Sequence, residues 1–128
     1  MKLQGRSIYR GKAEGETLTT SMGISFFGGV DPETGKVVEK GHELEGKSIS
    51  GKILVFPSGK GSTVGSYSLY QLKYNQLAPL AIINTVCETI IAVGCIISEI
   101  PCIDNIPIEQ IKSGIHAKVD GEKGIIEF

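Results

Sequence analysis

Two short apolar runs in the middle of the chain predict buried strands. The first covers residues 53–56 and stops at Pro57, and the second covers residues 79–83. Residues 62–75 lie between them with helical spacing, and Pro79 prevents a helix from continuing further. Two buried strands joined by a helix predict a parallel pair with a crossover connection.

Further elements are predicted on both sides of this unit. Residues 3–20 alternate weakly and are divided by glycines, which predicts short strands, and residues 24–27 predict another strand. A second main helix, apolar on most of its surface, is predicted to end before Pro101. Thr85 and Glu88 have the spacing of a capping box, so we expect Thr85 to cap this helix.

The C-terminal third predicts smaller elements. Residues 101–104 fit a third short strand, residues 108–111 a helical turn, and residues 116–119 and 124–128 a hairpin. The chain is therefore expected to form one α/β domain over residues 1–128. Its layers are mixed β/β/α, with a β-rich layer and two main helices.

The connection from the first buried strand to its helix holds the clearest candidate chemistry. Residues 58–62 contain only Ser, Gly and one Lys, ahead of a helix N-terminus that stabilises anions or oxyanions. A nucleotide phosphate loop is excluded: with Lys60 as its lysine, Leu54 and Gly61 occupy the required Gly and Ser/Thr positions. Val64 excludes the dinucleotide fingerprint in the same way. The segment is either another kind of anion loop or a turn that caps the helix.

Composition excludes several classes of partner. The 128 residues are 41% hydrophobic and 21% charged, and the formal net charge of −1 gives no electrostatic footprint for nucleic acid or an anionic membrane. No apolar run approaches the roughly 18 residues of a membrane-spanning helix, and the N-terminus has no apolar leader segment. We therefore expect a cytoplasmic location.

Three cysteines, Cys87, Cys95 and Cys102, are separated by seven and six residues, which matches no short zinc pattern. Three thiolates are in principle ligands for an iron–sulfur cluster. Each cysteine lies in or beside apolar sequence, however, and this favours their role as small buried hydrophobes.

Two polar loops precede the central unit. Gly28 and Gly29 suggest a close approach of the backbone to another segment, and Asp31 fits a turn residue that accepts a local hydrogen bond. His42 lies in the second loop, where a single histidine is expected to be exposed and inert. It gains interest only if the fold places it beside Ser62.

Three segments together resemble the swivel domain, or small subunit, of the aconitase X group. They are residues 23–35, the pattern His42-x-Leu44-x-Gly46, and residues 57–66. The likeness covers essentially the whole chain in order. The fold that the resemblance implies, a swivelling β/β/α domain, agrees with the predicted layers.

The resemblance implies half of a hydro-lyase site. In this group the large subunit holds a [4Fe-4S] cluster that binds the leaving hydroxyl, and the swivel chain contributes a serine that removes the proton. Ser62 matches that serine, and this chain is expected to bind no metal itself. The resemblance further implies that carboxylate or phosphate is bound by Ser58, Gly59, Lys60, Gly61 and Ser66, and that Gly28, Gly29, Asp31 and His42 line the cleft.

Free-standing chains of this length are most similar to archaeal members of the group. Those members dehydrate (R)-5-phosphomevalonate to trans-anhydromevalonate 5-phosphate in the mevalonate (isoprenoid) pathway. Two alternatives stay open: dehydration of another hydroxy acid such as cis-3-hydroxyproline, and a non-catalytic module that binds a phosphorylated metabolite. Because the second helix is apolar nearly all round, we also expect an exposed apolar surface for a large partner subunit, as in a heterodimer.

Overall fold

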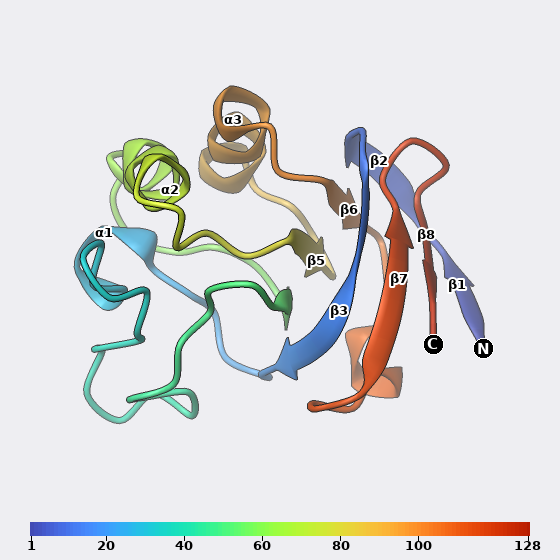
Figure 1. The fold of residues 1–128 in the computed structure, drawn as a ribbon, viewed down its shortest axis with the longest axis horizontal. Coiled ribbons are helices and arrows are strands. Elements are labelled where there is room, and N and C mark those ends of the chain that lie inside the picture. The colour runs from blue at the N-terminus through green and yellow to red at the C-terminus, as the bar shows by residue number, and fades with distance from the viewer.

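The computed structural model describes residues 1–128 and arranges them in three layers (Figure 1). Its strands are β1 (Lys2–Gln4), β2 (Arg6–Tyr9), β3 (Lys12–Thr19), β4 (Ile53–Phe56), β5 (Ala81–Asn84), β6 (Cys102–Asp104), β7 (His116–Asp120) and β8 (Ile125–Glu127). Its helices are α1 (Phe26–Gly29), α2 (Gly65–Tyr74) and α3 (Thr89–Ser98), with a 3-10 turn η1 (Ile108–Gln110). The strands form one curved sheet in the order β1-β8-β7-β3-β4-β5-β6-β2.

The middle layer is the parallel part of this sheet. β4 pairs in parallel with β5 and with the end of β3, and β5 pairs in parallel with β6. β4 is buried on both faces, because Leu54 and Phe56 pack toward the helices while Ile53 and Val55 pack toward the opposite layer. This double burial explains its unbroken apolar sequence, and the predicted parallel pair with a helical crossover is confirmed.

β3 connects the middle layer to the antiparallel layer. Residues 12–16 pair antiparallel with β7, and residues 17–19 pair in parallel with β4. The predicted C-terminal hairpin is confirmed as β7 and β8, and β1 extends it on the outer side of β8. The glycines of residues 3–20 are predicted to divide this segment into short strands. Gly15 does not do so, because it lies within β3 and pairs with Ala117.

Helices α2 and α3 lie side by side on the far side of the parallel strands and form the third layer (Figure 1). One core fills the space between these helices and the sheet, and a second core fills the space between the parallel and antiparallel layers. The predicted α/β fold with β/β/α layers is confirmed, as are the strand at 102–104 and the helical turn near 108. None of the helices has the length and apolar character needed to cross a membrane.

The strand predicted at residues 24–27 is wrong. Only Ile24 makes a β-bridge, and the chain then forms α1, in which Phe27 (φ −85°, ψ 113°) and Gly28 (φ 85°, ψ −18°) leave the helical region. These angles are close to those of a type II turn, which requires a residue such as glycine at its second central position. Phe26 is buried and Phe27 is exposed, so the mostly apolar segment that suggested a strand enters a tight turn instead.

The capping box predicted at Thr85 is also wrong. α3 begins at Thr89, and Glu88 is its N-cap, with carboxylate oxygens that accept the N–H groups of Ile90 and Ile91 at 2.9 Å each. The N–H of Thr85 instead donates to the Pro57 carbonyl at 3.0 Å. Thr85, which follows β5, is therefore hydrogen-bonded to the residue directly after β4, and α3 begins only four residues later.

Candidate functional site

The candidate site lies where β4 ends and its loop leads into α2. A short parallel bridge joins this loop to Ile24, whose carbonyl accepts the Lys60 N–H at 3.0 Å and whose N–H donates to the Ser58 carbonyl at 3.3 Å. The structure thus brings together two segments that lie more than thirty residues apart in the sequence. Together they form one surface beside the N-terminus of α2.

Ser62 is exposed on the turn that enters α2. Its carbonyl accepts the Gly65 N–H at 2.9 Å, and its Oγ accepts the Val64 N–H at 3.1 Å. α2 itself starts at Gly65, three residues later than the sequence suggested. The Ser62 hydroxyl oxygen therefore accepts a backbone hydrogen bond and lies next to the positive end of the α2 dipole. The hydrogen bond and the helix dipole both favour negative charge on that oxygen.

Two glycines fix the loop against its surroundings. A Cβ on Gly59 would lie 2.5 Å from both Glu88 Oε1 and Ile91 Cγ1, so this residue packs directly on the N-terminus of α3. Gly61 has a φ of +90°, and a Cβ there would lie 2.5 Å from Ser25 Oγ. The loop is held between α3 and the segment before α1.

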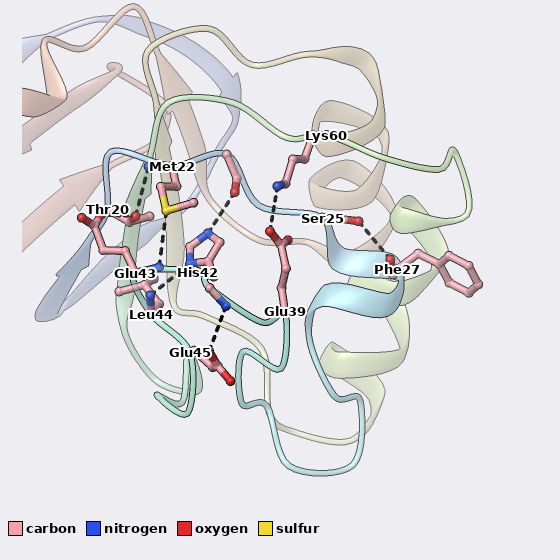
Figure 2. Close-up of polar contacts among 12 residues, drawn as sticks. Thr20, Met22, Ser25, Phe27, Glu39, His42, Glu43, Leu44, Glu45 and Lys60 are labelled. Carbon is pink, nitrogen blue, oxygen red and sulfur yellow. Dashed lines mark hydrogen bonds and ion pairs between the residues drawn. The ribbon is translucent and has the colours of Figure 1, made fainter.

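Lys60 does not point freely into solvent. Its Nζ lies 2.9 Å from Glu39 Oε2, and the exposed fractions of the two side chains are 46% and 29% (Figure 2). Glu39 lies in the long connection between α1 and β4. The only cation of the loop is thus paired with a carboxylate that the sequence pattern gave no reason to single out.

His42 is buried, which contradicts the expectation of an exposed loop histidine. It is 5% exposed, its Nδ1 accepts the Leu44 N–H at 3.0 Å, and its Nε2 lies 3.0 Å from the Gly23 carbonyl (Figure 2). Because Nδ1 accepts a hydrogen bond, Nε2 carries the proton and donates it, so the ring is neutral. His42 therefore ties its own loop to the segment that pairs with the Ser58 to Lys60 backbone.

Gly28, Gly29 and Asp31 lie around α1. Asp31 accepts the Glu33 N–H and the Thr34 hydroxyl at 3.0 Å each, so the predicted local hydrogen bonding of a turn aspartate is confirmed. The close approach predicted at Gly28 and Gly29 is wrong for Gly28, where a Cβ would have no atom within 4 Å. A Cβ on Gly29 would make ordinary contacts, at 3.4 Å from Ser25 Cβ and 3.6 Å from Glu39 Oε1. Glycine is needed at Gly28 for its φ of +85°. Gly28 and Asp31 do line one shallow hollow beside α2.

The two other predicted serines differ in position. Ser58 lies in the loop and is partly buried. Ser66 is 6% exposed, and its hydroxyl donates to the Ile90 carbonyl at 2.7 Å, between α2 and α3. The structure therefore places Ser66 in a helix contact, one turn away from the loop surface.

A second carboxylate, Glu43, anchors the end of β3 to the loop that carries His42. It accepts the hydroxyl of Thr20, which lies beside it in Figure 2, and the Ser21 N–H at 2.8 Å. The Thr20 hydrogen bond and then the Ser21 N–H hold the pKa of Glu43 below its ordinary value. Sequence reasoning missed Glu39 and Glu43 because their partners are about twenty residues away, and only Glu88, which precedes a helix, carried a local signal.

The cysteines do not form a metal site. No group of three or more His, Cys, Asp or Glu side chains is arranged to hold a metal ion, so the residues of this chain do not fit an iron–sulfur cluster. Cys87 and Cys102 lie with their sulfurs 3.9 Å apart, and their hydrogen bond, followed by burial, raises the pKa of Cys87. Cys95 and Cys102 are buried free thiols in the helix-side core, as the sequence favoured.

The outer face of α3 is apolar and exposed. Val93, Ile96 and Ile97 are 42%, 50% and 41% exposed, and Val86 just before the helix is 57% exposed. The expected exposed apolar surface on the second main helix is therefore confirmed.

Comparisons with known proteins agree over nearly the entire chain. Residues 2–128 match the family model described as the aconitase X swivel domain. The phosphomevalonate dehydratase small subunit of Methanosarcina acetivorans is 59% identical, with 100% of this chain and 91% of that protein covered. The protein of the same name from Thermococcus kodakarensis is 54% identical, covering 100% of this chain and 96% of that protein. A crystal structure of Thermococcus kodakaraensis aconitase X in the holo form contains a chain with 53% identity and a TM-score of 0.98, covering 99% of this chain and 97% of that chain.

Proposed function

The chain belongs to the aconitase X swivel domain family, and from this premise we propose that it is the small subunit of a hydro-lyase that dehydrates (R)-5-phosphomevalonate to trans-anhydromevalonate 5-phosphate. Relatives that carry the name phosphomevalonate dehydratase small subunit are 50–59% identical over essentially the whole chain, which supports this substrate. The reaction is part of the mevalonate pathway. It takes place in the cytoplasm, and residues 1–128 act in it as one swivel domain.

The observation that carries the proposal is the environment of Ser62. Ser62 acts as the base in its alkoxide form: its oxygen takes a proton from the carbon next to the one that bears the hydroxyl, and the electron pair of that C–H bond forms the double bond. The hydroxyl departs with the C–O electron pair and becomes water by taking a second proton from solvent. A serine oxygen is a very weak base at neutral pH, so it needs stabilisation of its negative charge. The Val64 N–H at 3.1 Å and the N-terminus of α2 supply that stabilisation.

The rest of the loop binds the anionic groups of the substrate. Ser58, Gly59, Lys60 and Gly61 precede Ser62 in the same loop, and they contribute N–H, hydroxyl and cationic donors. His42 and Ser66 act as positioning residues, because their polar atoms are bonded to the backbone of other segments. Gly28 and Asp31 line the hollow beside α2, and Gly29 lies between them in the chain.

A large partner subunit completes the site. Ser62 is exposed in this chain, and an exposed base reacts in bulk water, where charge stabilisation is weak. The partner covers the loop, holds the [4Fe-4S] cluster for which this chain has no ligand set, and supplies the Lewis acid for the leaving hydroxyl. The exposed apolar side chains of α3 give it a surface on which to dock.

The test is reconstitution of this chain with its large subunit under anaerobic conditions, followed by assay of phosphomevalonate dehydration. We expect no activity from either chain alone. Ser62→Ala should lower kcat by about 10²- to 10⁴-fold, the usual contribution of a general base, with the complex still intact by gel filtration. Ser7→Ala is the matched control, since Ser7 is an exposed serine of β2, the edge strand of the sheet.

Each negative outcome of this experiment would contradict a different part of the proposal. Full activity of Ser62→Ala would mean that Ser62 is only a turn residue and that the base lies elsewhere. An intact complex that dehydrates cis-3-hydroxyproline or another hydroxy acid, and not phosphomevalonate, would replace the substrate. An isolated chain that binds phosphomevalonate tightly, in a complex without dehydratase activity, would favour a non-catalytic binding module.

A further inference from the structure

The ion pair between Lys60 and Glu39 lies at the edge of the Ser62 loop (Figure 2). Lys60 is the only cationic residue between Ser58 and Val64, so any anion bound by this loop depends on it for a full positive charge. In this structure its Nζ is already engaged by Glu39 Oε2 at 2.9 Å. A carboxylate of the protein thus occupies the contact that an anionic ligand would make.

The two partners differ in how firmly they are held. The Glu39 N–H points to the Gly29 carbonyl at 3.4 Å, and Glu39 Oε1 lies 3.6 Å from where a Cβ on Gly29 would be, so the carboxylate sits against the backbone. The Lys60 backbone is bonded to Ile24, but its ammonium ends a flexible four-carbon stem that is 46% exposed. Lys60 is therefore the partner that is free to move.

We propose that Glu39 is a positioning residue: it holds Lys60 beside the loop until the carboxylate or phosphate of the substrate displaces it. This inference rests on the proposed function, because it takes the Ser62 loop as the substrate site. An ion pair with half-exposed side chains is weak, so exchanging one carboxylate for a substrate anion costs little. Glu39 keeps the long lysine side chain ordered at the site in the meantime.

If the substrate anion replaces Glu39 on Lys60, removing the charge of Glu39 and removing the charge of Lys60 should change the substrate affinity in opposite directions. Removing the charge of Glu39 removes a competitor for Lys60 and a repulsive charge near the substrate anion, so substrate binds more tightly. Removing the charge of Lys60 removes the attractive partner, so substrate binds more weakly. If the pair were only structural, losing either member would break the same contact, and both changes would act in the same direction.

The experiment measures phosphomevalonate binding to the reconstituted two-subunit complex by calorimetry. The small subunit carries Ser62→Ala in every sample so that binding is separated from turnover. We expect Glu39→Gln to lower the dissociation constant about two- to fivefold, the range of an exposed ion pair. Lys60→Met should raise it about tenfold or more, as expected for a charge-assisted hydrogen bond.

Glu33→Gln is the matched control, because Glu33 is an exposed carboxylate in the same connection that bonds to Asp31 through its backbone N–H and not through its side chain. It should leave the dissociation constant unchanged and so exclude a general effect of net charge. Unchanged or weaker binding in Glu39→Gln would overturn the inference, even if the wild-type complex dehydrates phosphomevalonate normally. Failure of the Ser62→Ala complex to bind phosphomevalonate at all would overturn both this inference and the proposed substrate.

Discussion

Gly59→Ala tests how tightly the Ser62 loop is packed on α3. Gly59 does not have a positive φ, so alanine introduces no backbone strain and its effect comes from space alone. The new Cβ would lie 2.5 Å from Glu88 Oε1 and from Ile91 Cγ1, distances that real Cβ atoms do not show. Ile91 is 1% exposed, and Glu88 is fixed by two N–H groups, so neither neighbour has room to move.

Two contributions add up to the expected loss of folding stability in Gly59→Ala. Overpacking a well-filled core costs about 1–3 kcal/mol. Displacing the Glu88 carboxylate weakens the N-cap of α3, which is worth about 1 kcal/mol. A total of about 2–4 kcal/mol corresponds to a fall in melting temperature of roughly 6–15 °C for a domain of this size.

The assay is thermal and urea denaturation of Gly59→Ala beside Gly15→Ala. The alanine Cβ in the control would meet Leu80 Cδ1 at 2.9 Å, but Leu80 is 40% exposed and the end of its side chain is free to rotate away. Gly15→Ala should therefore change the free energy of unfolding by less than about 1 kcal/mol. Equal stability of the two variants, with normal activity of the Gly59→Ala complex, would refute the close packing of the loop on α3.

Three further predictions concern other parts of the chain. The Thr20 hydroxyl and then the Ser21 N–H lower the pKa of Glu43 in the folded state. Its ionised carboxylate therefore stabilises the fold at pH values above the ordinary pKa of 4.5, and this stabilisation is lost as the pH falls through the lowered pKa. Glu43→Gln should therefore melt below wild type at neutral pH and approach it in acid, and equal melting curves at every pH would contradict this. Iodoacetamide at neutral pH should alkylate Cys87 slowly and the buried Cys95 and Cys102 only after unfolding, as mass spectrometry would show; rapid labelling of Cys87 would be inconsistent with its raised pKa. Ile96→Lys, at a position 50% exposed on α3, should leave the melting temperature nearly unchanged and prevent assembly with the large subunit in gel filtration, and normal assembly would place the interface elsewhere.

The elements with local signals were predictable from the sequence. β4 and β5 are buried on both faces, so β4 and residues 81–83 of β5 are unbroken apolar runs, and Pro57 and Pro79 lie at their ends. The predictions were wrong where one local sequence pattern fits two different structures. Residues 24–27 are mostly apolar, as in a short strand, although they enter a tight turn. Thr85 and Glu88 both suit a cap, although only Glu88 is one.

The site was predictable only in part because several of its contacts join distant segments. The spacing of the loop and its likeness to a known family directed attention to Ser62. Nothing local to His42 indicates that its ring reaches the Gly23 carbonyl, 19 residues earlier, or that Glu39 meets Lys60, 21 residues later. These contacts depend on how the long connection between α1 and β4 folds back, and that is decided by packing rather than by local pattern.

The shared strand β3 has a consequence for how the chain folds as it is synthesised. Its first half pairs only with β7, about a hundred residues later, and β1 pairs only with β8 at the other end of the chain. Until those last strands leave the ribosome, the face of the parallel sheet that carries Ile53, Val55 and Ile83 lacks the cover of Ala117, Val119 and Ile126. Contacts this far apart in sequence form slowly and leave apolar strands open to aggregation. The second core is therefore the final step of folding, and a nascent chain stalled before β7 is the species that chaperones would be expected to protect.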